Sequence, residues 1–143
     1  MTIKQLSVFV ENKKGRLTKI TKLLADNGID ISALSLADTS DFGVLRLIVN
    51  DTDKAKTVLR EAGIVVKATD VLAIVIDDHS GSCSEVLRVM SDNDIAIEYM
   101  YACAGRVSGK ALMIVRVDDM EKAQTVLSEN GYGKEVASDI YRI

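Results

Sequence analysis

The chain has 143 residues, a formal net charge of −3, 48% hydrophobic and 27% charged residues, and no proline. This composition is typical of an ordinary folded protein, and no apolar run approaches the roughly 20 residues that a membrane span needs. The first residues enter an alternating pattern without a charged and apolar leader, so we expect a cytoplasmic protein with no membrane partner. Cys83 and Cys103 lack CxxC spacing, which predicts free, buried thiols and no metal site.

Charge is distributed unevenly along the chain. Residues 1–68 carry 11 basic and 8 acidic side chains, whereas residues 69–143 carry 7 and 13. Opposite net charges favour attraction between the two halves. The acidic second half disfavours nucleic acid as a partner.

The predicted elements of the first half follow the order strand, helix, strand, strand, helix, strand. Apolar residues alternate in the first strand and recur at helical spacing in both helices, and segments 29–37 and 44–49 are β-rich around a polar turn, which predicts a hairpin. Gly28 and Gly63 follow the two helices as expected stop signals, because glycine adopts a left-handed conformation at little cost. The predicted ranges are 3–10, about 15–27, 29–37, 44–49, from Asp51 or Thr52 to 62, and 64–68.

The second half repeats both the order and some of the letters. Lys54 to Leu59 (KAKTVL) returns 68 residues later as Lys122 to Leu127 (KAQTVL), and Lys14-Gly15 matches Ser80-Gly81 at an offset of 66. A long, almost complete repeat of this kind indicates tandem copies of one small domain, which we place at 1–68 and 69–143 with a short joint at 67–70. The predicted elements of the second copy are 71–76, about 81–92, 95–103, 111–117, about 120–130 and a strand within 135–143.

Two βαββαβ copies predict an α+β fold. With right-handed crossovers, each copy forms a ferredoxin-like unit in which helices cover one face of an antiparallel sheet. Each copy alone is near the lower size limit for an independent core, so we expect the two to support each other.

The turn between the first strand and the first helix has the chemistry of a carboxylate site. Gly15 lets backbone N–H groups approach a ligand, and the first turn of a helix carries unpaired donors with partial positive charge. Lys13, Lys14 and Arg16 add positive charge. The same residues also fit a plain tight turn.

This segment resembles the first loop of the ACT domain, a small amino-acid-binding regulatory module. The loop of that family reads Asn, any residue, Pro, Gly, any residue, Leu; Asn12, Gly15 and Leu17 fit, and Lys14 replaces the proline. In the second copy Gly81 is retained, while Asp78, Ser80 and Cys83 occupy the places of Asn, Pro and Leu. The resemblance covers the whole chain, and the two loops are not equivalent.

The resemblance implies a ligand held between this loop of one domain and the second strand of its neighbour. For loop one the implied residues are Asn12, Lys13, Lys14, Gly15, Arg16 and Leu17, facing Glu98, Tyr99, Met100 and Tyr101. For loop two they are Asp78, His79, Ser80, Gly81 and Cys83, facing Ser35, Leu36, Ala37 and Asp38. Tyr99 and Tyr101 share one face of a strand, where aromatic side chains also serve as core or interface.

The resemblance also implies that two units lie side by side along their second strands, which would place the two strands joined at 67–70 several strands apart. Strands are spaced by about 5 Å and four linker residues reach about 13 Å. Three arrangements stay open: the two halves exchange a strand, the two halves contact each other through other strands, or the ligand site forms between two chains.

Enzyme motifs are absent from the sequence. There is no P-loop, no GxGxxG after a strand and no HExxH, and His79 sits with its acidic and serine neighbours in one short loop. The resemblance to the ACT domain implies a non-catalytic amino-acid sensor without cofactor or metal, which we expect to be a homodimer that acts on a partner enzyme or pathway. The alternatives are a regulatory subunit of an amino-acid biosynthetic enzyme that acts by protein contact, and, less favoured, a small acyl-phosphate hydrolase.

Overall fold

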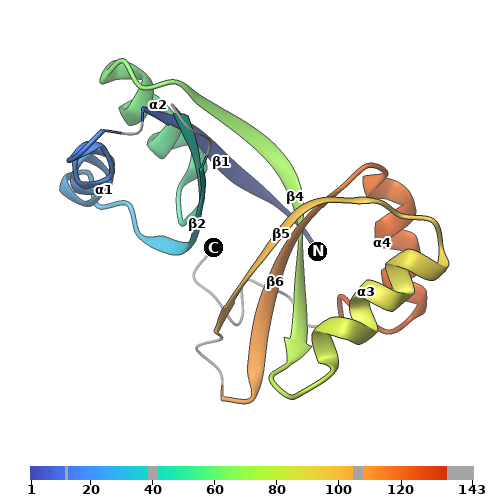
Figure 1. The fold of residues 1–143 in the computed structure, drawn as a ribbon. Coiled ribbons are helices and arrows are strands. Elements are labelled where there is room, and N and C mark those ends of the chain that lie inside the picture. The colour runs from blue at the N-terminus through green and yellow to red at the C-terminus, as the bar shows by residue number, and fades with distance from the viewer. Residues whose placement is uncertain (12, 39–41, 105–107, 135–143) are drawn as a thin grey trace. The chain divides into compact units, whose positions relative to one another are not determined.

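The computed structural model describes residues 1–11, 13–38, 42–104 and 108–134. Within these ranges there are four helices and six strands, drawn in Figure 1. In chain order they are β1 (Thr2–Glu11), α1 (Arg16–Asp26), β2 (Ile31–Asp38), β3 (Phe42–Val49), α2 (Thr52–Glu61), β4 (Val66–Asp77), α3 (Ser82–Asp92), β5 (Ile97–Ala104), β6 (Lys110–Val117) and α4 (Met120–Glu129). None of the helices in these ranges is long and apolar enough to cross a membrane.

By its internal contacts the chain divides into two compact units. Among the described residues, the first unit spans Lys4 to Thr69, and the second combines Met1–Ile3 with the chain from Asp70 to Lys134. β1 and β4 therefore each contribute residues to both units. The first unit has the strand order β2-β3-β1-β4 and the second has β4-β6-β5. On the side of β4 away from β6, the Ala73 N–H donates to the Met1 carbonyl at 2.7 Å.

Antiparallel pairing places the apolar side chains of each unit under its helices. In the first unit Val8 lies opposite Leu45, and both pack with Leu24 of α1 and Leu59 of α2. In the second unit Ile74 lies opposite Met113 and packs with Met90 of α3 and Leu127 of α4. The predicted α+β fold, built from βαββαβ units with helices over an antiparallel sheet, is confirmed.

The helices begin in two different ways, and each way recurs in both units. α2 and α4 start after Asp51 and Asp119, whose carboxylates accept from the N–H groups of Lys54 and Lys122 at 2.9 and 3.0 Å. α1 and α3 start after glycines in the left-handed region and receive no side-chain cap. A carboxylate cap satisfies a free amide of the first turn, so α1 and α3 are the helices with an amide terminus left for another partner.

One prediction about the joint is wrong. Residues 64–68 and 71–76 do not form two strands separated by a linker, because Val66–Asp77 is one continuous strand. The polar residues at 67–70 suggested a loop, but no glycine or proline in this stretch interrupts the extended backbone. The strand predicted within 135–143 lies outside the described residues.

Candidate ligand-binding site

Loop one, Lys13 to Gly15, turns the chain from β1 into α1. Gly15 has φ 82°, and a Cβ at this position would meet no atom within 4 Å, so the demand for glycine comes from the backbone conformation. The Arg16 N–H donates to the Lys13 carbonyl at 3.3 Å, and the Lys19 N–H donates to the Gly15 carbonyl at 3.0 Å. The turn therefore ends in a helix terminus whose second and third amides have no side-chain cap.

Glu11, the last residue of β1, organises the positive charge of loop one. Its carboxylate lies 2.8 Å from the Arg16 guanidinium and 3.0 Å from the Lys13 ammonium. The hydrogen bond from Lys13, then the one from Arg16, holds the pKa of Glu11 below its usual range. Two cations share one carboxylate and Lys14 is exposed beside them, so the loop keeps a positive charge for an anionic ligand.

A cavity of about 100 Å³ opens beside loop one, and we call it the loop-one cavity. It brings together four predicted residues, with Leu17 and Leu36 supplying apolar wall. Leu36 was predicted to face loop two, yet within its own unit it borders loop one. The lining residues are Val10, Glu11, Lys13, Arg16, Leu17, Leu36 and Gly43.

Sequence reasoning missed Glu11 and Gly43 at this cavity. Gly43 is buried, and a Cβ there would lie 3.2 Å from Leu36 Cδ1 and 3.3 Å from the Ala37 carbonyl oxygen. Any larger residue would therefore crowd the side chain of Leu36, which lines the cavity. The signals available in the sequence were the position of Glu11 next to Asn12 and the glycine at the end of the polar turn.

Loop two, Asp78 to Gly81, repeats the backbone of loop one with different chemistry. Gly81 has φ 101° and precedes α3. Ser82 is buried, and its Oγ lies 3.1 Å from His79 Nδ1. The hydrogen bond and charge of Lys110, 2.8 Å away, hold the pKa of Asp77 below its usual range. The acidic group beside loop two is therefore already paired within its own unit.

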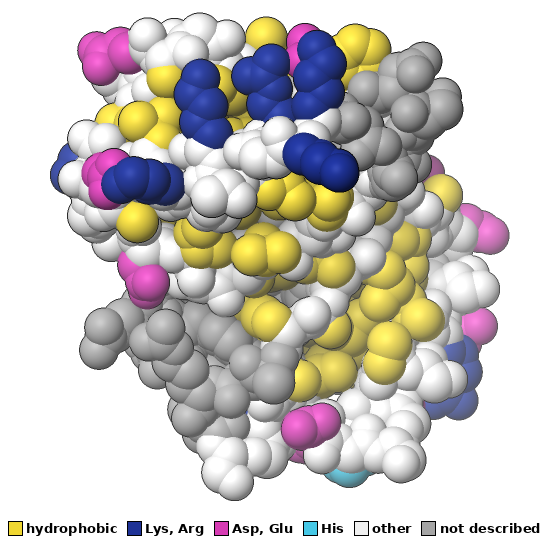
Figure 2. All heavy atoms as spheres, turned by 60° about the vertical axis from the view of Figure 1, so that its left-hand side comes forward, with side chains coloured by type: hydrophobic (Ala, Val, Ile, Leu, Met, Phe, Trp, Pro, Cys, Tyr) yellow, Lys and Arg dark blue, Asp and Glu magenta, His cyan; other side chains and the backbone are white. Residues whose placement is uncertain are grey.

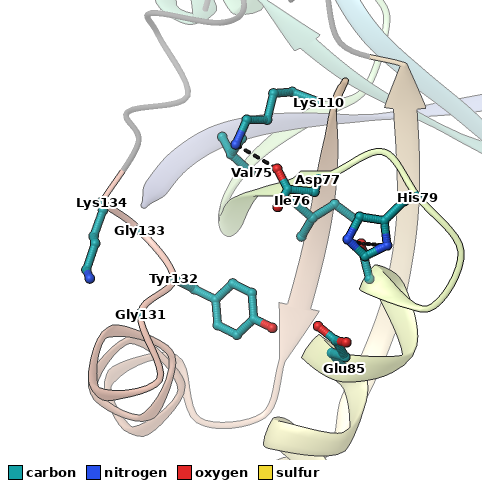
Figure 3. A pocket seen from close by; sticks show the side chains of 11 residues that line it. Val75, Ile76, Asp77, His79, Glu85, Lys110, Gly131, Tyr132, Gly133 and Lys134 are labelled. Carbon is teal, nitrogen blue, oxygen red and sulfur yellow. Dashed lines mark hydrogen bonds and ion pairs between the residues drawn. The ribbon is translucent and has the colours of Figure 1, made fainter. Parts of the chain in front are cut away.

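The cavity beside loop two has a volume of about 250 Å³, and we call it the histidine cavity. Figure 3 shows the Tyr132 hydroxyl pointing toward Glu85, while Lys134 points away from both. Burial, and then the charge of Glu85, raises the pKa of Tyr132. His79 is the predicted residue in this cavity, whereas Ser82, Glu85, Lys110 and Tyr132 were missed.

Several predicted residues lie elsewhere. The prediction that Cys83 is buried is wrong, since its side chain is exposed in the first turn of α3. Its equivalent Leu17 is itself 40% exposed, so this helical position faces outward in both copies. Cys103 is free and half-buried.

The predicted second strand, β5, presents its residues on both faces. Tyr99 and Tyr101 share one face and are half-buried, while Met100 packs against the core of the second unit. Glu98 lies at an irregularity in the pairing with β6, and its carboxylate is 3.4 Å from Arg116 Nε.

Two predicted groupings stay predictions. Loop one and β5 belong to different units, as do loop two and residues 35–38 of β2, so each pairing requires a neighbouring unit of this chain or of another. Asn12 lies outside the described residues. Within the described ranges, no group of three or more His, Cys, Asp or Glu side chains could hold a metal ion.

Comparison with protein-family models decides the family. A model of the ACT domain pair matches residues 1–139. The chain belongs to the ACT domain family. The prediction of two ACT units in tandem is confirmed, and with it the assignment to a family associated with allosteric regulation.

Solved structures with the fold of this ACT domain pair span a wide range of sequence identity. Protein BT0572 from Bacteroides thetaiotaomicron is 41% identical, with a TM-score of 0.91 over 100% of this chain and 98% of that chain. The ligand-free regulatory subunit of aspartate kinase from Thermus thermophilus is 13% identical, with a TM-score of 0.63 over 90% and 94%. Aspartokinase III of E. coli, in complex with lysine and aspartate, is 19% identical, with a TM-score of 0.53 over 90% of this chain and 31% of that chain.

The two aspartate kinase structures share the fold of this ACT domain pair, and at such low identity the likeness shows the fold alone. A search of curated proteins gives no match.

Proposed function

We propose that this ACT domain pair is a non-catalytic amino-acid sensor whose ligand binds at loop one. The observation that carries the proposal is the convergence of an uncapped helix terminus, a positively charged loop and two exposed leucines on one cavity. The amides after Gly15 and the cations Lys13 and Arg16 suit an α-carboxylate. Leu17 and Leu36 suit an apolar side chain.

The loop-one cavity supplies one wall of the proposed site. Its volume of about 100 Å³ is below the roughly 300–1,000 Å³ of complete small-molecule pockets. A neighbouring unit therefore has to close it, and Glu98, Tyr99, Met100 and Tyr101 are the proposed second wall. Glu98 would offer a carboxylate to the α-ammonium group. Closure by a neighbouring unit of this chain or of a second copy makes binding and domain arrangement one equilibrium, which is what a regulatory switch requires.

Calorimetric and thermal-shift titrations against the common amino acids test this function. A ligand at 100-fold its Kd stabilises the folded state by about 2.7 kcal/mol, which shifts the midpoint of unfolding by several degrees. We expect one amino acid or a small related group to produce this shift. A folded protein that responds to none of them would refute the sensor function.

The two loop glycines provide matched variants. Gly15→Val and Gly81→Val place a β-branched residue in the same left-handed conformation, with no atom within 4 Å of the added Cβ in either loop. We expect Gly15→Val to abolish amino-acid binding and Gly81→Val to leave it intact. Circular dichroism verifies that both variants fold. The reverse pattern of binding would show that loop two, not loop one, is the site.

A second candidate function is that of a regulatory subunit that acts by protein contact. It is favoured by the exposed apolar side chains of the edge strand β2, where Leu34 and Leu36 are 57% and 47% exposed. Exposed apolar residues on an unpaired edge strand are a feature of association surfaces. Co-purification of a large biosynthetic enzyme from native lysate would support this function, and a stable dimer that captures no enzyme would count against it.

A further inference from the structure

The first unit contains a second cavity beside the start of α1. Its volume is about 270 Å³, and we call it the phenylalanine cavity. It lies between the end of β1, the first turns of α1 and the segment Gly63–Val65 that enters β4. It shares Val10, Glu11 and Arg16 with the loop-one cavity, whereas Phe9, Lys19 and Phe42 line only this one of the two.

The phenylalanine and histidine cavities occupy equivalent places in the repeat. Glu11 pairs with Phe42 in the first unit, as Asp77 pairs with Lys110 in the second. The N–H groups of Lys19 and Glu85 donate to Gly15 and Gly81, each at 3.0 Å. The strand pairing and the first helical hydrogen bond thus establish which residue of one cavity is equivalent to which residue of the other, and the side chains of the two cavities can be compared directly.

Aromatic surface distinguishes the phenylalanine cavity. The chain has two phenylalanines, and both line it: Phe9 is 50% exposed and Phe42 is 57% exposed. Val65, which is 65% exposed, stands beside them. Large apolar side chains are normally buried, and a group of them around a hollow marks a place where an apolar partner binds.

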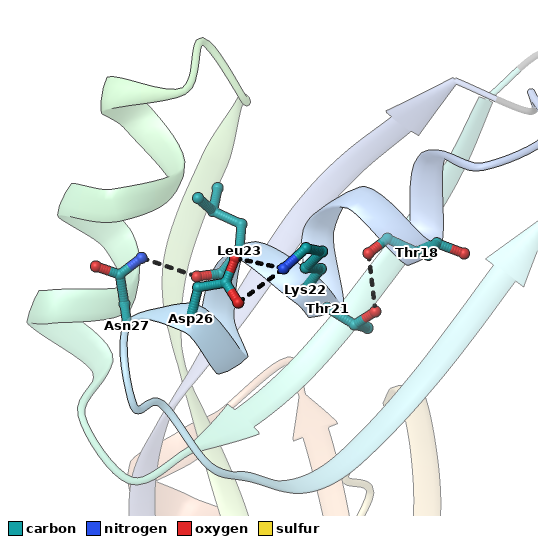
Figure 4. Close-up of polar contacts among 6 residues, drawn as sticks. All are labelled: Thr18, Thr21, Lys22, Leu23, Asp26 and Asn27. Carbon is teal, nitrogen blue, oxygen red and sulfur yellow. Dashed lines mark hydrogen bonds and ion pairs between the residues drawn. The ribbon is translucent and has the colours of Figure 1, made fainter.

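A free cation stands at the helical wall of this cavity. On α1, Lys22 pairs with Asp26 at 2.8 Å, as Figure 4 shows, and Arg16 pairs with Glu11. Among the described residues Lys19 has neither an ion pair nor a side-chain hydrogen bond. Its ammonium group is thus the cation of α1 that no carboxylate of the described residues engages.

The equivalent cavity has no phenylalanine, and its helical wall carries a carboxylate in place of a cation. Glu85 stands in place of Lys19, and Lys110 in place of Phe42. Val75 replaces Phe9, and a tyrosine, Tyr132, replaces Ile64. An aromatic anion suited to the first cavity would meet a carboxylate and no phenylalanine in the second.

We infer that the phenylalanine cavity is a second ligand site, which binds a small molecule with an aromatic ring and a carboxylate. The ring packs against Phe9 and Phe42 in the offset or edge-to-face geometry that aromatic pairs prefer. The carboxylate accepts from the ammonium group of Lys19. No α-ammonium group is needed, because Glu11 is neutralised by Lys13 and Arg16. Basic side chains also border exposed hydrophobic surface on the face drawn in Figure 2.

Calorimetry with 3-phenylpropionate tests this inference, because the probe carries the ring and the carboxylate without an α-ammonium group. We expect saturable binding at one site per chain. Acetate, which lacks the ring, and 3-phenylpropanol, which lacks the carboxylate, should bind at least about tenfold more weakly. Equal binding of all three, or no binding of 3-phenylpropionate, would overturn the inference.

Substitutions copied from the equivalent cavity locate the site. Lys19→Glu and Phe42→Lys introduce residues that the same fold holds at positions 85 and 110, and both positions are exposed in the first unit. Each should weaken 3-phenylpropionate binding about tenfold or more. Lys22→Glu makes the same charge change on the outer face of α1, so it serves as the control and should leave binding unchanged. Equal losses in Lys19→Glu and Lys22→Glu would reduce the effect to net charge and overturn the inference.

Two further measurements distinguish this site from loop one and from a contact surface between copies of the chain. Gly15→Val should abolish amino-acid binding at loop one and retain 3-phenylpropionate binding, so the two sites can fail independently. Sedimentation of Phe42→Lys identifies the alternative occupant. If this variant changes the oligomeric state and 3-phenylpropionate does not bind to the wild type, then the phenylalanines serve contact between copies and the ligand site is refuted.

Discussion

At the scale of single residues, Glu11 is the group on which the charge of loop one depends. Its side chain is 43% exposed, and two cations hold its carboxylate. A folded-state pKa below the unfolded value of 4.5 means that its contribution to stability is present above about pH 4.5 and is lost as the pH falls through the lowered pKa.

The pKa of Glu11 should follow its partners one by one. We expect Lys13→Met to raise it toward 4.5 by the largest step, and Arg16→Met by a smaller one, because the hydrogen bond from Lys13 is the leading cause of the shift. The side-chain carbon shift of Glu11, followed by NMR through an acid titration, measures this pKa. Lys14→Met is the control, and an unchanged pKa in Lys13→Met would contradict the assignment.

At the scale of elements, each unit contains one helix capped by an aspartate and one helix that starts at a glycine, and the two kinds of helix differ in what they border. α2 and α4 satisfy their first-turn amides with an aspartate from the same chain and act as scaffold. α1 and α3 start from a left-handed glycine and border the cavities. The nearly identical residues at 54–59 and 122–127 thus lie in the capped helices, and the diverged loop residues lie beside the cavities.

The aspartates that cap α2 and α4 give a stability prediction that can be tested twice, once in each unit. Asp51→Ala and Asp119→Ala should each lower the free energy of unfolding by about 0.5–2 kcal/mol, because each leaves a first-turn amide without its acceptor. Asp51→Ser and Asp119→Ser keep an acceptor and should cost much less. Urea unfolding followed by circular dichroism measures the differences, and equal losses from alanine and serine would show that the cap contributes little.

Sequence-based prediction worked best for elements whose ends are marked by single residues, such as a terminating glycine or a capping aspartate. Helix ends at Gly28 and Gly63, the aspartate caps and the core side of β1 all follow from short patterns. The joint was misjudged because polarity at 67–70 does not end a strand when its backbone groups find ladder partners.

The site was predictable in the parts that belong to loop one itself. The glycine turn and the cations could be recognised locally, whereas Glu11 holding Lys13 and Arg16 required the geometry. The phenylalanine cavity was not foreseen, since Phe9, Lys19, Phe42 and Val65 come from four elements or connections, and no local pattern brings them together.

At the scale of the whole molecule, the sequence repeat and the structural units have different boundaries. The sequence repeat places one boundary, between residues 68 and 69, whereas in the structure Met1–Ile3 belong to the unit that begins at Asp70. Met1 packs against the core of the second unit, and its carbonyl accepts from the Ala73 N–H.

This grouping predicts a selective effect of shortening β1. A chain that begins at Lys4, produced by cleaving a removable leader, loses the acceptor for Ala73 and the packing of Met1. We expect amide hydrogen exchange to accelerate at Ala73 and its neighbours in β4, while amides of the first core such as Leu47 stay protected. Equal acceleration in both units would show that Met1–Ile3 do not belong to the second unit alone.

The pairing of Met1 with Ala73 also sets the order of events during synthesis. At 5–20 residues per second the ribosome needs about 4 to 14 s to make the residues between them, and throughout that time the first residues of β1 have no strand to pair with. The first unit can begin to pack before the second exists, but its first strand stays partly open. The cell therefore holds an unpaired strand end for seconds in each nascent chain, and a chaperone that binds extended apolar segments would meet it there.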